Sequence, residues 1–180
     1  MHSARAIGTR MGAKAYVRGM TMIELLITVV VMAILMAIAV PSFRNASLGS
    51  QLSAAANNLL ASVQLARSEA IKRNTEMTLC ASADGEACAV SGGWEQGWIV
   101  TMDPLVPTSV LQYQQGLPDK YLVSQAGGTA QIKFQPIGVG ATAAIFTVCR
   151  DNPDGSQERV LTVSATGSAR VTVTNTGSCS

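Results

Sequence analysis

The chain contains one long, almost unbroken apolar segment close to its N-terminus. Residues 25–40 are apolar at every position except Thr28. Together with residues 20–24 the segment has 21 positions. A helix of that length spans about 31 Å, at about 1.5 Å per residue, which is the thickness of the hydrocarbon core of a bilayer. The pattern therefore predicts a membrane-spanning helix.

A second helical pattern begins just beyond Pro41. Apolar residues recur every three or four positions over residues 42–74, which places them on one face of a helix, and the opposite face is polar. The positions of this apolar stripe are Leu52, Ala56, Leu59, Val63, Ala66 and Ala70. Proline lacks the backbone N–H of the helical ladder, so Pro41 predicts a kink or local melting between the two helical segments.

The apolar period changes to two after Asn74, and glycine and proline become frequent. The candidate strands are residues 76–81, 97–102, 110–113, 121–124, 131–135, 144–149, 159–164 and 169–174. One long helix followed only by strands predicts an α+β fold, in which an antiparallel β-sheet domain covers one face of the helix. We expect Trp94 and Trp98 to belong to the packing of that domain.

Charge is distributed unevenly along the 180 residues. The net charge is +2, but Arg5, Arg10, Lys14 and Arg18 all precede Gly19, and the remaining nine basic and eleven acidic residues sum to −2. Basic residues on the N-terminal side of the apolar segment predict a cytoplasmic N-terminus and an exported remainder.

An ordinary secretory signal peptide is the alternative for this region. Ala37-Ile38-Ala39 provides a small-residue cleavage site late in the apolar segment. However, the apolar run is long for a signal peptide, and Glu24 lies within it. A carboxylate is energetically unfavourable in an apolar segment, and an acid found there usually has a function. The sequence therefore favours a retained helix.

Catalysis and metal binding find little support in the residues present. The one histidine is His2, so histidine-dependent catalysis and histidine-ligated zinc are excluded if the N-terminal residues are removed. The carboxylates are scattered, and no glycine-rich phosphate-binding loop is evident. We therefore expect a protein that is not an enzyme and that uses no cofactor or metal.

The residues at the start of the apolar segment resemble a known signature. Gly19-Met20-Thr21-Met22-Ile23-Glu24-Leu25-Leu26, followed by the apolar run and Pro41-Ser42-Phe43, is similar to the N-terminus of type IV prepilins and type II secretion pseudopilins. The resemblance implies that a prepilin peptidase cuts between Gly19 and Met20 and methylates the new amine. It implies a leader at residues 1–19, a transmembrane and filament-core helix at 20–43, and a periplasmic pilin-like domain at 44–180, with translation starting at Met1 or Met11.

The same resemblance gives Glu24 a role in assembly, because it becomes the fifth mature residue. A carboxylate buried among apolar helices must be neutralised, and the natural partner is the amino terminus of Met20 in a neighbouring subunit. The alternative is a carboxylate that only reaches the lipid headgroups. The partners implied are membrane lipids, the peptidase, and other minor and major pilins or pseudopilins.

Residues farther along the chain narrow the resemblance to the FimT/GspH branch. The matching positions are residues 65–74, Leu79-Cys80, Asp84-Gly85, Cys88, Trp94, residues 97–100 and Asp103. This branch implies a minor pilin of a type IV pilus that assembles through its N-terminal helix near the tip and helps to initiate or cap the filament. The alternative that shares these features is a GspH-type minor pseudopilin of a type II secretion system.

Four cysteines, Cys80, Cys88, Cys149 and Cys179, are available for disulfides after export to an oxidising compartment. Three pairings are possible. Proximity in the sequence favours Cys80 with Cys88, which closes the turn at Asp84-Gly85, and Cys149 with Cys179, which holds the C-terminus.

A pilus-associated DNA receptor for natural transformation is a third interpretation. Some FimT-like pilins bind DNA through a C-terminal Gly-Arg-x-Arg pattern, and in residues 167–170 Ser168 takes the first arginine position, which leaves only Arg170. The candidate phosphate contacts are Arg150, Arg159 and Arg170. In a remainder with net charge −2 they form a weak basic footprint, and we expect them to be solvated surface charges.

Overall fold

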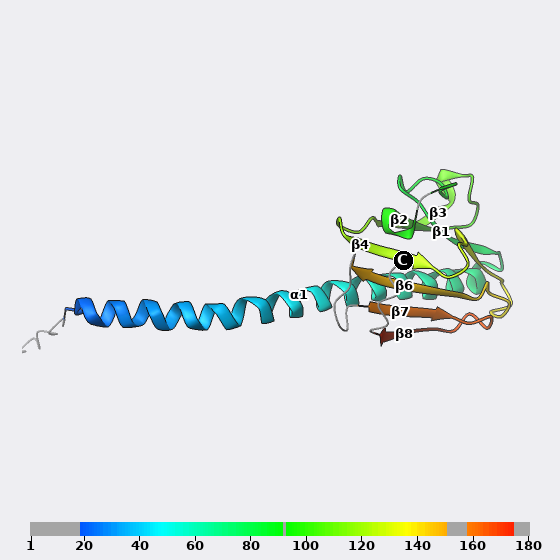
Figure 1. Ribbon diagram of the computed structural model, residues 1–180. Helices are drawn as coiled ribbons and strands as arrows, with labels where there is room; N and C mark the ends of the chain where they lie inside the picture. The colour runs from blue at the N-terminus through cyan, green and yellow to red at the C-terminus, as the bar shows by residue number, and fades with distance from the viewer. Residues whose placement is uncertain (1–18, 92, 151–157, 175–180) are drawn as a thin grey trace, which may run out of the picture. The chain divides into compact units, whose positions relative to one another are not determined.

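The computed structural model describes residues 19–91, 93–150 and 158–174. Within these residues one α-helix, α1 (Met22–Arg73), precedes the strands (Figure 1). The strands are β1 (Met77–Ala81), β2 (Gly97–Thr101), β3 (Val110–Gln115), β4 (Tyr121–Gln125), β5 (Gln131–Phe134), β6 (Ala144–Arg150), β7 (Glu158–Val163) and β8 (Ala169–Thr174). Two short 3₁₀ helices, η1 (Trp94–Gln96) and η2 (Pro107–Ser109), precede β2 and β3. Residue contacts divide the chain into two units, Met1–Ser42 and Phe43–Ser180.

The eight strands predicted from the period of two are all present, with ends that differ from the expected ones by no more than two residues. Of the kink or local melting expected at Pro41, the melting is wrong, because α1 is one continuous helix from Met22 to Arg73. Proline removes the N–H that would bond to the carbonyl of Ala37, and its ring crowds that carbonyl, but the helix continues on both sides of the position.

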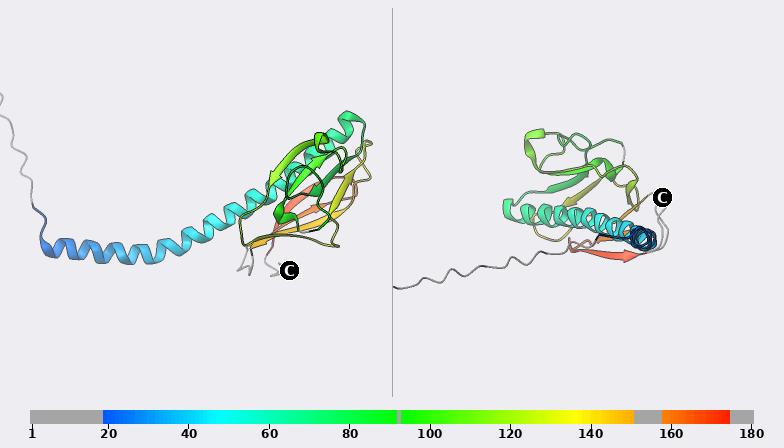
Figure 2. Two further views of the ribbon diagram at one scale, coloured as in Figure 1. Left: turned by 90° about the horizontal axis from the view of Figure 1, so that it is seen from above. Right: turned by 90° about the vertical axis from the view of Figure 1, so that its left-hand side faces the viewer.

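The second part of α1 supplies one side of the core of the unit Phe43–Ser180. The six residues of the predicted apolar stripe, from Leu52 to Ala70, are all fully buried. In both views of Figure 2 this part of the helix runs alongside the strands. The predicted α+β arrangement is therefore confirmed.

The strands form two antiparallel sheets rather than one. The orders are β3-β2-β1-β5 and β4-β6-β7-β8. Trp94 and Phe146 link the sheets through an edge-to-face ring contact, with centroids 4.8 Å apart. Trp98 on β2 ties the first sheet to α1, because its indole Nε1–H donates a 2.9 Å hydrogen bond to the hydroxyl of Ser62. Both tryptophans are buried, as expected.

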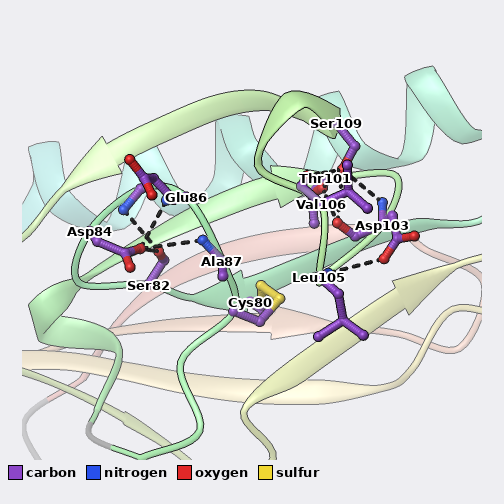
Figure 3. Close-up of a disulfide and its surroundings, with 12 residues drawn as sticks. Cys80, Ser82, Asp84, Glu86, Ala87, Thr101, Asp103, Leu105, Val106 and Ser109 are labelled. Atoms are coloured by element: carbon purple, nitrogen blue, oxygen red, sulfur yellow. Dashed lines mark hydrogen bonds between the residues drawn. A yellow bond between two sulfur atoms is a disulfide. The ribbon is translucent and has the colours of Figure 1, made fainter.

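Every residue of β1 and β2 is buried, so both faces of these two strands are covered. Two loops lie next to them: the first loop follows β1 (residues 82–91), and the second loop follows β2 (residues 102–106). A disulfide joins Cys80 on β1 to Cys88 in the first loop, with Cα atoms 5.5 Å apart (Figure 3). The backbone N–H of Cys88 also donates to the carbonyl of Pro104 in the second loop, at 3.3 Å. The Cys80–Cys88 pairing favoured from the sequence is confirmed. Cys149 is buried in β6, and Cys179 lies outside the described residues.

Candidate assembly segment

The apolar segment is exposed along its whole length. Each residue from Gly19 to Val40 is exposed, and Met22–Val40 has a mean hydropathy of 2.8. Burying one large aliphatic side chain contributes roughly 1.5–3 kcal/mol. An uncovered aliphatic surface of this length is typical of a helix that lipid tails or other apolar helices surround.

Thr21 caps the beginning of α1. Its hydroxyl accepts a 3.2 Å hydrogen bond from the backbone N–H of Glu24, and its carbonyl accepts one from the N–H of Leu25. Threonine followed three residues later by glutamate is a capping-box sequence. Glu24 consequently lies in the first turn of α1, where the helix dipole favours a negative charge. The spacing of Thr21 and Glu24 is the sequence signal for this cap, which was not among the predictions from the sequence.

The expected processing site lies just outside the helix. Gly19 and Met20 precede α1 in exposed, non-helical backbone, and a Cβ placed on Gly19 would meet no atom within 4 Å. A peptidase needs an accessible bond, and the two residues of the Gly19–Met20 bond are both exposed.

The residues that resemble the FimT/GspH branch serve the packing of α1. Ala66 and Ala70 are fully buried. Arg67 donates a 3.1 Å hydrogen bond from Nη2 to the carbonyl of Gly138, which links the helix to the loop after β5. Glu69 forms ion pairs with Lys72 and Arg73 at 3.3 and 2.6 Å. Ala66, Arg67 and Ala70 therefore hold α1 against the rest of the domain, whereas the ion pairs of Glu69 lie within the helix.

The structure does not gather the three candidate phosphate-binding arginines into one exposed patch. Arg159 is only 9% exposed, and its guanidinium donates to the hydroxyl of Ser53 and to the carbonyl of Gly49 on α1. The expectation that Arg159 is a solvated surface charge or phosphate contact is therefore wrong, since it anchors β7 to the helix. Arg150 and Arg170 are exposed. Across the sheet, Arg170 is level with Ile145 of β6, and Arg150 lies five residues farther along that strand, roughly 16 Å away.

The carboxylate of Asp84 is also structural. Asp84 accepts hydrogen bonds from the backbone N–H groups of Glu86 and Ala87, and these bonds, with that from Glu86 the largest, lower the pKa of Asp84 (Figure 3). In the described part of the chain, no three His, Cys, Asp or Glu side chains lie close enough together to hold a metal ion.

Comparison with known proteins identifies both parts of the chain. Residues 55–167 match the family model described as type II transport protein GspH, and residues 14–40 match the prokaryotic N-terminal methylation motif. No curated protein sequence shows a significant match.

Solved structures of the same fold include the type IV minor pilin FimU of Pseudomonas aeruginosa. In its P21 crystal form it aligns with a TM-score of 0.56 at 21% identity, over 68% of this chain and 89% of that chain. In its P65 form the TM-score is 0.54 at 21% identity, over 67% and 91%. The minor pseudopilin EpsH from the type 2 secretion system of Vibrio cholerae aligns with a TM-score of 0.49 at 13% identity, over 68% and 97%.

The similarity to FimU concerns the fold, a long helix packed on antiparallel sheets. The GspH model covers more than half of the sequence, and the methylation motif contains the whole exposed apolar segment Met22–Val40. The chain therefore belongs to the GspH family and has the fold and the N-terminal motif of type IV pilin-like proteins.

Proposed function

We propose that this chain is a minor pilin of a type IV pilus, which assembles through its N-terminal helix and helps to initiate or cap the filament. The observation that carries the proposal is the uncovered apolar helix Met22–Val40, which continues directly into a domain of the GspH family. The helix supplies a membrane anchor and a surface for other helices.

Processing prepares the segment for assembly. Cleavage after Gly19 leaves Met20 as the N-terminal residue, one position before the cap formed by Thr21. The new amine is positive and lies at the N-terminal end of α1, four positions before the exposed Glu24. Methylation would retain this charge.

Glu24 then selects and aligns neighbouring subunits. An unpaired carboxylate within the bilayer costs up to about 2.5–3.5 kcal/mol, least near the headgroups, and the cost rises when apolar helices replace lipid and water around it. The amine of Met20 on a neighbouring subunit would neutralise the charge. Because each subunit has one acid and one amine, this pairing would fix the axial register.

The proposal places the N-terminus in the cytoplasm and the domain in the periplasm, with the mature protein near the filament tip. Four basic residues precede the apolar segment, and this asymmetry supports the orientation. The partners are other minor and major pilins and, before assembly, the prepilin peptidase.

Glu24→Ala tests the assembly role. The variant chain should enter the membrane and begin at Met20, as measured by intact mass and N-terminal sequencing, but should be absent from sheared filaments. Glu86→Ala, which removes an exposed acid of the domain, is the matched control. Normal incorporation of Glu24→Ala would refute the role. A soluble mature protein that begins beyond Ala39 would refute the whole proposal.

A minor pseudopilin of a type II secretion system is the second candidate, favoured by the description of the matching family model. Deletion of the gene separates the two. Loss of surface pili with intact protein secretion supports the minor pilin, and loss of secretion with intact pili supports the pseudopilin.

A further inference from the structure

Strand β8 (Ala169–Thr174) is an edge of the second sheet. Its sheet neighbour is β7, and the pairing is regular over all six residues. The described residues donate no backbone hydrogen bond to its other side. The edge β5 of the first sheet differs, because the N–H of Thr142 donates to the carbonyl of Lys133 there, at 3.0 Å.

The hairpin geometry shows which backbone groups of β8 point away from β7. The N–H of Ser164 donates to the carbonyl of Ser168 at 2.9 Å, next to the turn between β7 and β8. In an antiparallel pair, residues that bond to the partner strand alternate with residues that point away from it. Arg170, Thr172 and Thr174 therefore bond to β7, and Ala169, Val171 and Val173 direct their N–H and C=O groups to the free edge.

This edge lacks the usual protection against strand pairing. β8 has no proline, lysine or bulge, and five of its six residues are alanine, valine or threonine. Val173 is 61% exposed, although the residue opposite it, Arg159, is buried. Beside the start of β8, a groove of about 400 Å³ separates Gln64 and Ile71 of α1 from the turn at Gly167.

The charge of Arg170 indicates which kind of strand can pair with the edge of β8. Arg170 is exposed and has no ion-pair partner among the described residues. Strands β1 to β6 and β8 contain no acidic residue, and the one acid of β7, Glu158, is fully buried. A second copy of this chain therefore offers no described strand with a carboxylate to place against Arg170.

We propose that the free edge of β8 binds an extended segment of a different pilin-like subunit, which bears an aspartate or glutamate opposite Arg170. The segment adds a fifth strand to the sheet, bonds to the backbone of Ala169, Val171 and Val173, and covers Val173. The identity of the partner rests on the proposed function, whereas the strand-binding edge does not.

Val173→Pro is the sharpest perturbation, because proline removes an N–H that points away from β7 and leaves the bonds between β7 and β8 intact. Val173→Thr keeps that N–H and is the matched control. The probe is the full-length chain, expressed in its native host, with the photo-crosslinking residue benzoylphenylalanine in place of Thr172. Light-induced adducts are identified by mass spectrometry.

We expect an adduct with another pilin-like subunit, on a peptide that contains an acidic residue. Val173→Pro should reduce its yield at least tenfold, and Val173→Thr should leave it within twofold. An unchanged yield in Val173→Pro would overturn the proposal. So would an adduct confined to residues 175–180 of the same chain, to a second copy or to DNA, or the absence of any adduct.

A second variant covers the case in which Val173→Pro lowers the thermal midpoint of the domain. Arg170→Glu places a negative charge opposite the expected acid and should reduce the adduct at least fivefold, whereas Arg170→Lys should retain it. Equal yields in these two variants would count against the charge assignment. If the adduct persists while Glu24→Ala enters filaments normally, the strand-binding edge stands and the assembly role of Glu24 fails.

Discussion

The hydrogen bond between Ser62 and Trp98 offers a direct test of how α1 is held to the first sheet. The Ser62 hydroxyl accepts from the Trp98 indole at 2.9 Å and donates to the carbonyl of Asn58 at 3.0 Å. Ser62 is fully buried and Trp98 is 1% exposed, so water cannot replace either partner. Ser62→Ala therefore leaves a buried indole N–H without an acceptor.

The expected cost follows from that unsatisfied donor. Leaving a buried polar group unpaired lowers the free energy of unfolding by about 1–3 kcal/mol. For a domain of this size, 1 kcal/mol corresponds to a shift in Tm of about 3 °C, so Ser62→Ala should lower Tm by about 3–9 °C. The double variant Ser62→Ala/Trp98→Phe also lacks the indole donor. Its loss in free energy of unfolding should therefore be smaller, by about 1 kcal/mol, than the sum of the losses in the two single variants.

The assay is thermal unfolding of the full-length chain in detergent micelles, followed by near-ultraviolet circular dichroism. Trp94 and Trp98 are both buried in the domain, so the signal reports its packing. Ser68→Ala is the matched control, because the Ser68 hydroxyl is exposed and bonds only to the carbonyl of Leu65. Equal shifts for Ser62→Ala and Ser68→Ala would refute the reasoning, as would strictly additive single and double variants.

Two further predictions concern the loop that the disulfide closes. Cys80→Ala/Cys88→Ala opens a loop with a sequence separation of 8, and the chain-entropy relation gives a loss of about 2.5 kcal/mol, measurable as a lower urea midpoint. Hydrogen bonds from Glu86 and then Ala87 lower the pKa of Asp84 below its ordinary value of 3.8. A depressed folded-state pKa stabilises the domain above pH 3.8, and this contribution is lost as the pH falls through the folded-state pKa. The urea midpoint of Asp84→Asn should therefore depend less on pH between 5 and about 2.5 than that of the unmodified chain, and parallel curves would contradict this assignment.

Periodicity predicted the elements well because burial imposes it directly. The stripe from Leu52 to Ala70 and the alternation in the strands record which side chains face the core, and the structure buries the stripe completely. Periodicity could not divide the strands into two sheets. That division depends on contacts between distant residues, such as the ring contact of Trp94 with Phe146.

The residues of the candidate site could be predicted where they lie close together in the sequence. Gly19, Met20 and Glu24 lie in one short segment, so their spacing alone placed them at the start of the apolar helix. Arg159 was misjudged because its acceptors, Gly49 and Ser53, are more than 100 positions earlier in the chain. A charged residue with such partners has the same sequence pattern as one that faces water.

The two surfaces proposed for assembly have different physical characters, and this difference bears on specificity. The helix Met22–Val40 offers aliphatic side chains, whose attraction is non-directional, with Glu24 as its one charged position. Such a helix can pack against many similar helices, and one acid fixes register without distinguishing between partners that all present the same amine. The edge of β8 offers backbone groups in a fixed order and one cation, Arg170, which demand a strand of matching register and opposite charge. Choice of partner should therefore reside in the domain, and exchanging the helix for that of another pilin-like protein should change the partner less than Val173→Pro does.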